Sequence, residues 1–221
     1  MPSVAKSRIV VLYLTKYAET SVVLHAIDAQ SGRRSFLVRG LKRGNAVAAF
    51  HPLSVLDVVS AESPKSSLSW LREWEPAVSL HEIRSNRTKS AVAMFISEVL
   101  YRSFTTELAD PQFFEWICGI IGTLDREAGS IANFPLWFLV SYAVQLGFQP
   151  GDPVEPQGIF TPAETDLLLK VLRSPFETAM SFPLSADRRQ AFSRSMLQYL
   201  SYHLGASIDA KSLDVLHAVL I

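Results

Sequence analysis

Five basic side chains in one short part of the chain have the types and spacing to bind a phosphate backbone: Arg33, Arg34, Arg39, Lys42 and Arg43. The last three belong to SFLVRGLKRGNA (35–46), whose two glycines would let the main chain approach a strand closely. Guanidinium and ammonium groups that neutralise phosphates release counterions, which gives a salt-sensitive affinity for nucleic acid of any sequence. The RGLKR turn (39–43) is therefore a candidate contact for nucleic acid, and Arg33 and Arg34 belong to the same local excess of positive charge.

The distribution of charge supports a local basic surface on a chain that is neutral overall. Residues 1–80 contain ten Lys and Arg against six Asp and Glu, whereas residues 81–221 contain eleven against fifteen. No acidic residue occurs between Asp28 and Asp57. A local excess of one sign is typical of a surface for an anionic partner. The alternative is a solvated turn after residue 39 and a charged hairpin end at residues 33 and 34.

Four aromatic residues near this stretch are candidates for stacking on unpaired bases: Phe36, Phe50, Trp70 and Trp74. Stacking of one base on an aromatic side chain contributes about 1 to 3 kcal/mol. The alternative is that these residues fill the interior of a small β domain.

The sequence contains none of the motifs GxSxG, GxxxxGK[ST], HExxH and GxGxxG, which mark common catalytic and nucleotide sites. Its five histidines lack metal-ligand spacing, and we interpret Glu73 and Glu75 as a solvated strand edge. Cys118 is the only cysteine, so neither an internal disulfide nor a multi-cysteine zinc site can form. Its place on an apolar helix stripe indicates an inert thiol. We predict no catalytic residue, no metal site and no cofactor, and hence no enzyme.

The elements that must position the basic stretch begin with short runs rich in β-branched and aromatic residues. Strands are expected over residues 8–14, 21–28, 35–39, 52–61 and around 68–78. The segment AQSG ends in Gly32 and suggests a hairpin between the second and third strands. Five short strands in about 75 residues indicate a small barrel or sandwich.

From about Arg84 the apolar period changes from two residues to 3.6, which predicts helices for the rest of the chain. Asp110 before Pro111 marks one helix start. The segment TPAE, which begins at Thr161, forms a capping box with proline at the first helical position and marks another.

Length and composition are those of a globular protein of one or two domains, since 48% of the 221 residues are hydrophobic and 19% are charged. The change of period predicts an α+β, two-domain fold, with a β domain over residues 1–80 and an all-helical domain over 81–221. The longest apolar run, 134–148, is interrupted and shorter than the roughly 20 residues of a membrane span. No secretory signal is evident at the N-terminus, so we expect a cytoplasmic protein.

The stretch RIVVLYLTKYAETSVVLHAIDAQSGRRSFLVRGLKR resembles the N-terminal signature of the RecO family of bacterial DNA repair proteins. In that signature a strand, a YGExS-like turn, a second strand and a turn lead to a third strand that runs into xxRGxxR. Here the first turn has Ala18 in place of glycine. The later segments FISEVLYRSF, LGFQP and YLSYHLGASIDAKSLDVL follow in the family's order. The four zinc-binding cysteines that many members carry after LGFxP are absent, so the resemblance is to a zinc-free branch.

This resemblance implies an OB-fold N-terminal β-barrel followed by a helical domain, in a non-enzymatic recombination mediator. Such a protein binds single- and double-stranded DNA, anneals complementary strands, and works with RecR to help RecA replace the single-strand-binding protein. Carried over to this sequence, the RGLKR turn is the main DNA contact, with Arg33 and Arg34 next. The expected place is the bacterial cytoplasm, at the nucleoid during repair.

The family also engages the acidic C-terminal tail of the single-strand-binding protein. A tail of this kind requires an apolar groove with a cation at its rim. Arg102 and Lys211 stand beside apolar helix faces and are the candidates, although they could simply flank helices. Two other functions stay open at this point. One is a protein–protein adaptor that acts through the helical domain without direct DNA binding, and the other is an enzyme with an unfamiliar site.

Overall fold

The computed structural model describes residues 4–40, 48, 50–61, 68–151 and 158–220. Contacts divide the chain into two units, of which one comprises Met1–Ser85 with Phe104–Asp125 and the other Asn86–Ser103 with Arg126–Ile221. Each unit is thus assembled from two separate stretches of chain. The division of the sequence between residues 80 and 81 stays a prediction.

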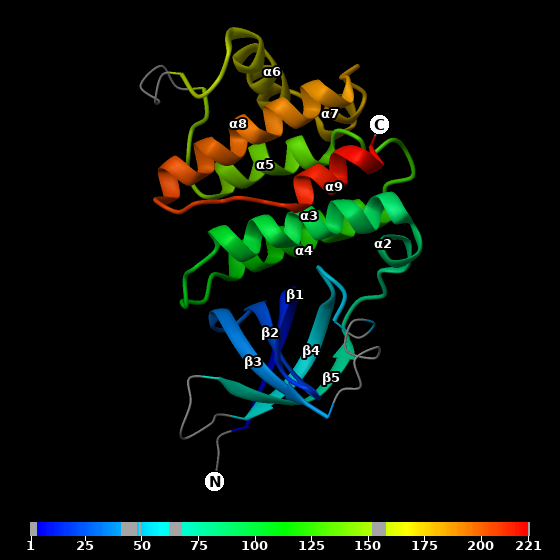
Figure 1. The fold of residues 1–221 in the computed structure, drawn as a ribbon, viewed down its shortest axis with the longest axis vertical. Coiled ribbons are helices and arrows are strands. Elements are labelled where there is room, and N and C mark those ends of the chain that lie inside the picture. Colours follow the sequence, from blue (N-terminus) through cyan, green and yellow to red (C-terminus); the bar gives the residue numbers. More distant parts are fainter. Residues whose placement is uncertain (1–3, 41–47, 49, 62–67, 152–157, 221) are drawn as a thin grey trace. The chain divides into compact units, whose positions relative to one another are not determined.

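Five strands of the first unit close into a barrel, drawn in blue to green in Figure 1. They are β1 (Val4–Ala18), β2 (Ser21–Asp28), β3 (Gly32–Arg39), β4 (Val55–Ala61) and β5 (Ser69–Pro76). Their order around the barrel is β1-β2-β3-β5-β4. All neighbours run antiparallel except β3 and β5, which are parallel. This closed, OB-like barrel, followed by a helical region, confirms the predicted fold class.

One face of each strand fills the barrel interior. The buried apolar cluster consists of Ile9, Val11, Leu24, Ala26, Phe36, Val38, Phe50, Leu56, Val58 and Leu71. Because successive strand residues point to opposite faces, this burial leaves Arg39 on the outer face of β3. Phe36 and Phe50 are at most 2% exposed, so the prediction that they stack on bases is wrong. Both rings instead fill the interior of the barrel.

The predicted hairpin between β2 and β3 is confirmed, and two residues shape it. The buried Asp28 carboxylate accepts hydrogen bonds from Ser7 Oγ at 2.6 Å and from the Gln30 main-chain N at 2.7 Å. Gly32 has φ +68°, and a Cβ there would lie 2.7 Å from the Thr106 carbonyl oxygen. Glycine therefore allows the 104–110 segment to approach the hairpin.

Among its described residues the first unit also contains the helices α2 (His81–Ser85) and α4 (Pro111–Arg126). Asp110 Oδ1 accepts a hydrogen bond from the Phe113 main-chain N at 2.9 Å, which confirms the predicted helix start. Asp125 near the end of α4 accepts one from the Ile83 main-chain N at 2.8 Å and ties the two helices together.

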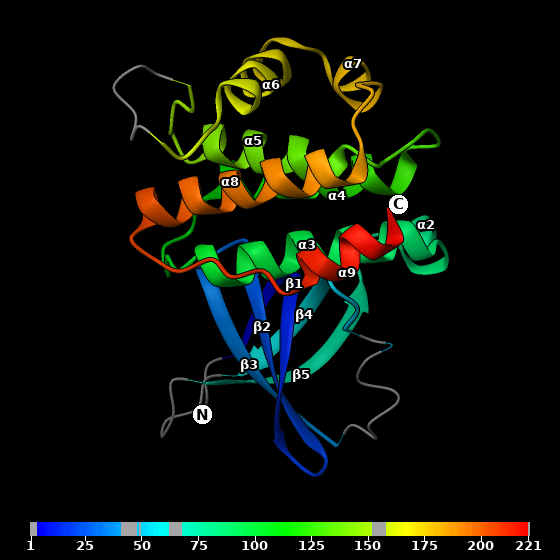
Figure 2. The ribbon, with the colours of Figure 1, turned by 45° about the horizontal axis from the view of Figure 1, so that its top comes forward.

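The second unit is helical. It contains α3 (Arg87–Ser103), α5 (Phe134–Gln145), α6 (Pro162–Arg173), α7 (Phe176–Met180), α8 (Ala186–Leu204) and α9 (Ser212–Val219). Helix α3 packs against α9, and α5 against α8 (Figure 2). The capping box at Thr161 is present, with the side chain of Glu164 bonded back to the Thr161 main-chain N at 2.8 Å. Across the described ranges, no helix is long and apolar enough to cross a membrane.

Candidate nucleic-acid interface

Arg39, the last residue of β3, presents an exposed cation on the outer face of the barrel. Its guanidinium lies over the ring of half-buried Trp70, 4.9 Å from the centroid. The two strands meet here because Leu37 of β3 pairs with Trp70 of β5. A planar cation held on an aromatic face keeps its edge N–H groups turned outward, in the geometry that binds a phosphate with two hydrogen bonds. The chain leaves the strand through Gly40 at φ +74°.

The other cations of the predicted RGLKR turn, Lys42 and Arg43, lie outside the described residues, so their contact with DNA stays a prediction. The two predicted tryptophans differ. Trp70 supports Arg39, whereas Trp74 packs partly against the barrel core with its ring 5.1 Å from that of Phe50. Of the two tryptophans, Trp70 is thus the one that lies beside a predicted DNA contact among the described residues.

Arg33 and Arg34 lie within β3, which begins earlier than expected. The Arg33 guanidinium donates to the Phe104 carbonyl at 3.4 Å, and that of Arg34 donates to Ser69 Oγ at 2.6 Å. Both side chains therefore bind neighbouring segments of the same unit. Arg33 shares the outer face with Arg39, roughly 20 Å away at the rise of a β-strand. A DNA contact at either residue stays a prediction.

Three hydrogen-bonded side chains cross the outer face from β1 to β3. His25 Nε2 lies 3.0 Å from Thr15 Oγ1, and His25 Nδ1 lies 2.8 Å from Ser35 Oγ. Partial burial lowers the pKa of His25, and the positive charge of Arg33 lowers it further. The imidazole is therefore neutral at neutral pH, so positive charge on this face comes from the arginines.

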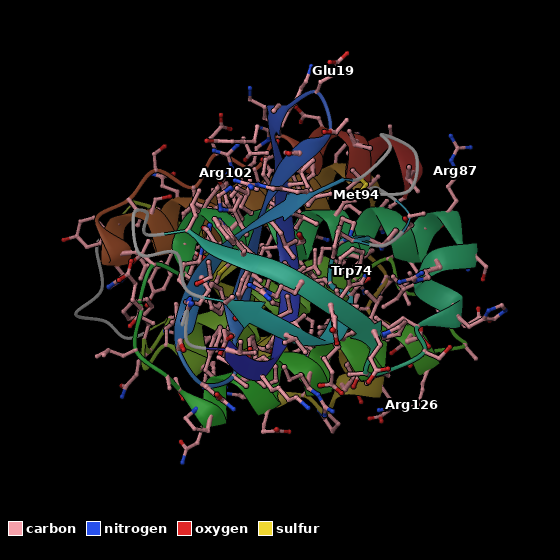
Figure 3. The ribbon with its side chains drawn as sticks, turned by 90° about the horizontal axis from the view of Figure 1, so that it is seen from below. Glu19, Trp74, Arg87, Met94, Arg102 and Arg126 are labelled. Carbon is pink, nitrogen blue, oxygen red and sulfur yellow. The ribbon has the colours of Figure 1, made fainter. Side chains whose placement is uncertain are left out.

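Sequence reasoning does not single out Tyr13 and Tyr17, which are 49% and 63% exposed on β1. Tyr13 pairs across the strands with His25. Glu19 marks the tip of the same hairpin in Figure 3. Exposed aromatic rings on a barrel surface suit base stacking. The register of β1 with β2 shifts between Lys16 and Ala18, so Tyr17 lies at an irregularity of the ladder that the strand period of two does not predict.

The candidates for partner binding, Arg102 and Lys211, flank one junction between α3 and α9. Arg102 donates to Glu98 Oε1 from Nε at 2.9 Å and from Nη2 at 2.8 Å. The other oxygen, Glu98 Oε2, accepts hydrogen bonds from the main-chain N and Oγ of Ser212, which follows Lys211. The fold thus brings the two candidates to one hydrogen-bond network. Their role toward a partner stays a prediction.

An apolar pocket of the helical unit combines aliphatic walls with a cation. Its lining includes Pro135, Leu136, Leu213, Leu216, Arg189 and His217. The guanidinium of Arg189 donates to the carbonyl oxygens of Leu184 and Leu220, each at 2.5 Å. Burial lowers the pKa of Arg189, which reflects a charge partly withdrawn from water.

The next features are the single thiol, Cys118, and the side chains that could bind a metal ion in the described part of the chain. No group of three or more His, Cys, Asp or Glu side chains there is arranged to hold a metal ion. Burial raises the pKa of Cys118 to about 11, with a further contribution from Glu115. Since the thiolate is the reactive form, this thiol is unreactive at neutral pH, in agreement with the prediction.

Comparison with known proteins shows the family. The family model described as Recombination protein O N terminal matches residues 1–80, and the one described as Recombination protein O C terminal matches residues 84–151. Curated relatives named DNA repair protein RecO match over nearly their whole length. The one from Bacteroides fragilis is 30% identical over 94% of this chain and 95% of its own. The one from Flavobacterium psychrophilum is 29% identical, over 97% and 98%.

The relative from Porphyromonas gingivalis is 28% identical over 95% of this chain and 96% of its own. The resemblance predicted from the motifs is therefore confirmed. The chain belongs to the RecO family, whose members are recombination mediators in DNA repair and not known catalytic enzymes.

Proposed function

We propose that this protein binds single- and double-stranded DNA, anneals complementary strands, and acts with RecR to help RecA replace the single-strand-binding protein. Family membership supports the mediator role. The single observation that carries DNA binding is Arg39 held over Trp70 on an exposed face, at the start of the basic turn. The proposed setting is the bacterial cytoplasm, at the nucleoid during repair.

The proposed mechanism is electrostatic. Cations on the barrel neutralise phosphates of two strands, which lowers the repulsion between them and lets pairing proceed without ATP. Tyr13 and Tyr17 stack on unpaired bases, each for about 1 to 3 kcal/mol, and so favour single strands before pairing. No cofactor and no covalent step are needed.

We assign the acidic tail of the single-strand-binding protein to the helical unit. Arg102 and Lys211 are the first candidates, and the pocket that contains Arg189 is the second, because it joins apolar walls to a cation. That combination suits a peptide that ends in an apolar residue and a free carboxylate.

Fluorescence anisotropy with labelled single-stranded DNA over a salt series tests the DNA interface. The logarithm of affinity should fall linearly with the logarithm of salt concentration. Arg39→Ala should reduce the slope by about 0.7, the value for one lost phosphate contact on a single strand. Arg39→Lys keeps the charge and should retain the slope, but lose affinity because an ammonium lacks the planar fork. Lys42→Ala with Arg43→Ala should reduce the slope further.

Arg173→Ala is the matched control, since Arg173 is an exposed cation of α6. It should leave the slope unchanged. If no DNA binds at low salt, DNA binding is refuted and the protein–protein adaptor is favoured. A slope that survives all three barrel substitutions would leave DNA binding intact but move the interface elsewhere.

A further inference from the structure

The first unit has a cleft of about 700 Å³ that the DNA proposal does not use. It lies where the start of β1, the turn after β2, and the strands β4 and β5 approach Phe114 of α4. Its charged lining residues are Lys6, Arg8, Asp57, Glu73, Glu75 and Glu115. Four carboxylates face two cations, so the cleft is negative although the protein has no net charge. Trp74 of β5, labelled in Figure 3, also lines it.

One of the two cations, Arg8, already forms an ion pair with a carboxylate of the cleft. The Arg8 guanidinium donates to both oxygens of Asp57, from Nε at 2.8 Å and from Nη2 at 2.9 Å. Within the described residues, Glu73, Glu75 and Glu115 make no hydrogen bond or ion pair. Three carboxylates are thus left with Lys6 as the one other cation of the lining.

Strand register adds a second, independent observation. Asp57 of β4 pairs directly with Glu75 of β5, so two carboxylates face each other across adjacent strands. Like charges in directly opposite positions destabilise a sheet. Arg8 of β1 lies opposite Asp57 on the other neighbouring strand, and its ion pair with Asp57 reduces this repulsion. The barrel therefore keeps an arrangement that folding disfavours and that a bound cation would relieve.

The chemistry of the cleft selects among occupants. DNA is repelled, because its phosphates would meet the carboxylates. A single metal ion is disfavoured, because the described residues hold no cluster of three ligands. Glu73 and Glu75 stand two residues apart on one face of β5, about 7 Å along the strand, which matches alternate side chains of an extended peptide.

We propose that this cleft docks an extended, Arg- or Lys-bearing segment of a protein partner. Alternate cations of the segment pair with Glu73 and Glu75, and Glu115 of α4 lines the same cleft. The described cations that we assign to DNA, Arg33, Arg34 and Arg39, lie on β3, whereas these carboxylates lie on β5 and α4. The barrel can therefore hold DNA and the partner at the same time. This inference does not rest on the proposed DNA binding.

The test uses the full chain and a fluorescein-labelled peptide of four arginines alternating with threonines, followed by anisotropy at low ionic strength. The cleft variant is Glu73→Gln with Glu75→Gln. The matched control is Glu19→Gln with Glu82→Gln, which removes the same charge from exposed sites outside the cleft. We expect the cleft variant to bind the peptide about fivefold more weakly, as two exposed ion pairs contribute together, and the control to bind as the wild type does.

Two results would overturn the proposal. They are no peptide binding by the wild type, and an equal loss in both variants. DNA affinity measured on the same samples reports separately on the proposed function. Sedimentation adds a further check, because self-association lost only in the cleft variant would make a second copy of the chain the occupant and refute a separate partner. Thermal unfolding completes the test, since the cleft variant should be at least as stable as the wild type.

Discussion

Replacing Glu98 by alanine removes the acceptor that joins α3 to the start of α9. The side chain is 16% exposed and accepts hydrogen bonds from Arg102 on one oxygen and from Ser212 on the other. Ser212 begins α9, where main-chain N–H groups have no partner inside the helix. A carboxylate at this position satisfies such donors and also interacts favourably with the helix dipole.

The expected loss follows from these contacts. Hydrogen bonds to a charged group contribute about 1.5 to 3 kcal/mol each, and the ion pair with the partly exposed Arg102 contributes less. We expect Glu98→Ala to lower the free energy of unfolding by about 3 kcal/mol, because the Ser212 donors are left without an acceptor. Glu98→Gln keeps the shape but turns an NH₂ group toward one set of donors, and should cost about 2 kcal/mol.

Urea unfolding followed by circular dichroism measures these losses, and pH gives a second readout. Burial alone raises the pKa of Glu98, but hydrogen bonds from Ser212 and Arg102 lower it by more, so the net pKa is below its ordinary value. A carboxyl of this kind stabilises the folded state fully above its unfolded pKa of about 4.3. That contribution is lost as the pH falls through the folded pKa. The difference between wild type and Glu98→Gln should therefore be full at neutral pH and shrink in acid.

Asp166→Asn is the control, because Asp166 is an exposed carboxylate of α6, a helix of the same unit. It should leave the free energy of unfolding within about 0.5 kcal/mol of the wild type. Equal stability of wild type and Glu98→Gln at neutral pH would refute the reasoning. A difference that persists unchanged in acid would do so as well, because it could not come from an ionised carboxylate.

Two further predictions concern the first unit. Gly32→Ala should cost more than the roughly 1 to 2 kcal/mol of a left-handed conformation, because its Cβ would meet the 104–110 segment. Gly205→Ala at φ +62° has open space and should pay only the conformational cost, so equal losses in urea unfolding would contradict the contact. Cys118, with a pKa of about 11, should react with iodoacetamide about a hundredfold more slowly in the folded than in the unfolded protein at mildly alkaline pH. Equal rates of alkylation, followed by mass spectrometry, would show that the thiol is not shielded.

Local patterns predict much of the fold because they act over a few residues. The cap at Asp110 and the capping box at Thr161 are visible in sequence, since the groups that bond lie within three positions of each other. The third strand is different, because it begins at Gly32 and not at Ser35. The Arg33 main-chain N donates to the Thr106 carbonyl at 2.7 Å, a contact that no local pattern contains.

For the candidate interface as well, one part can be predicted from residue type and another depends on strand pairing. Charge counting along the chain identifies Arg39 as part of a basic stretch, because charge is a property of residue type. It does not show that Trp70 supports the guanidinium, since that contact depends on the parallel pairing of β3 with β5. Nor does composition separate Phe36, which is fully buried, from the exposed Tyr13.

By itself the sequence determined the basic stretch, the change from strand to helix and the family. These depend on residue type, short-range periodicity and motif order. Only the tertiary structure decided which cations are held by neighbouring segments, that Arg102 and Lys211 flank the Glu98 junction, and that Asp57 faces Glu75 at an acidic cleft. Those relations join residues far apart in the chain. They arise when strands pair and helices pack, so no local pattern can carry them.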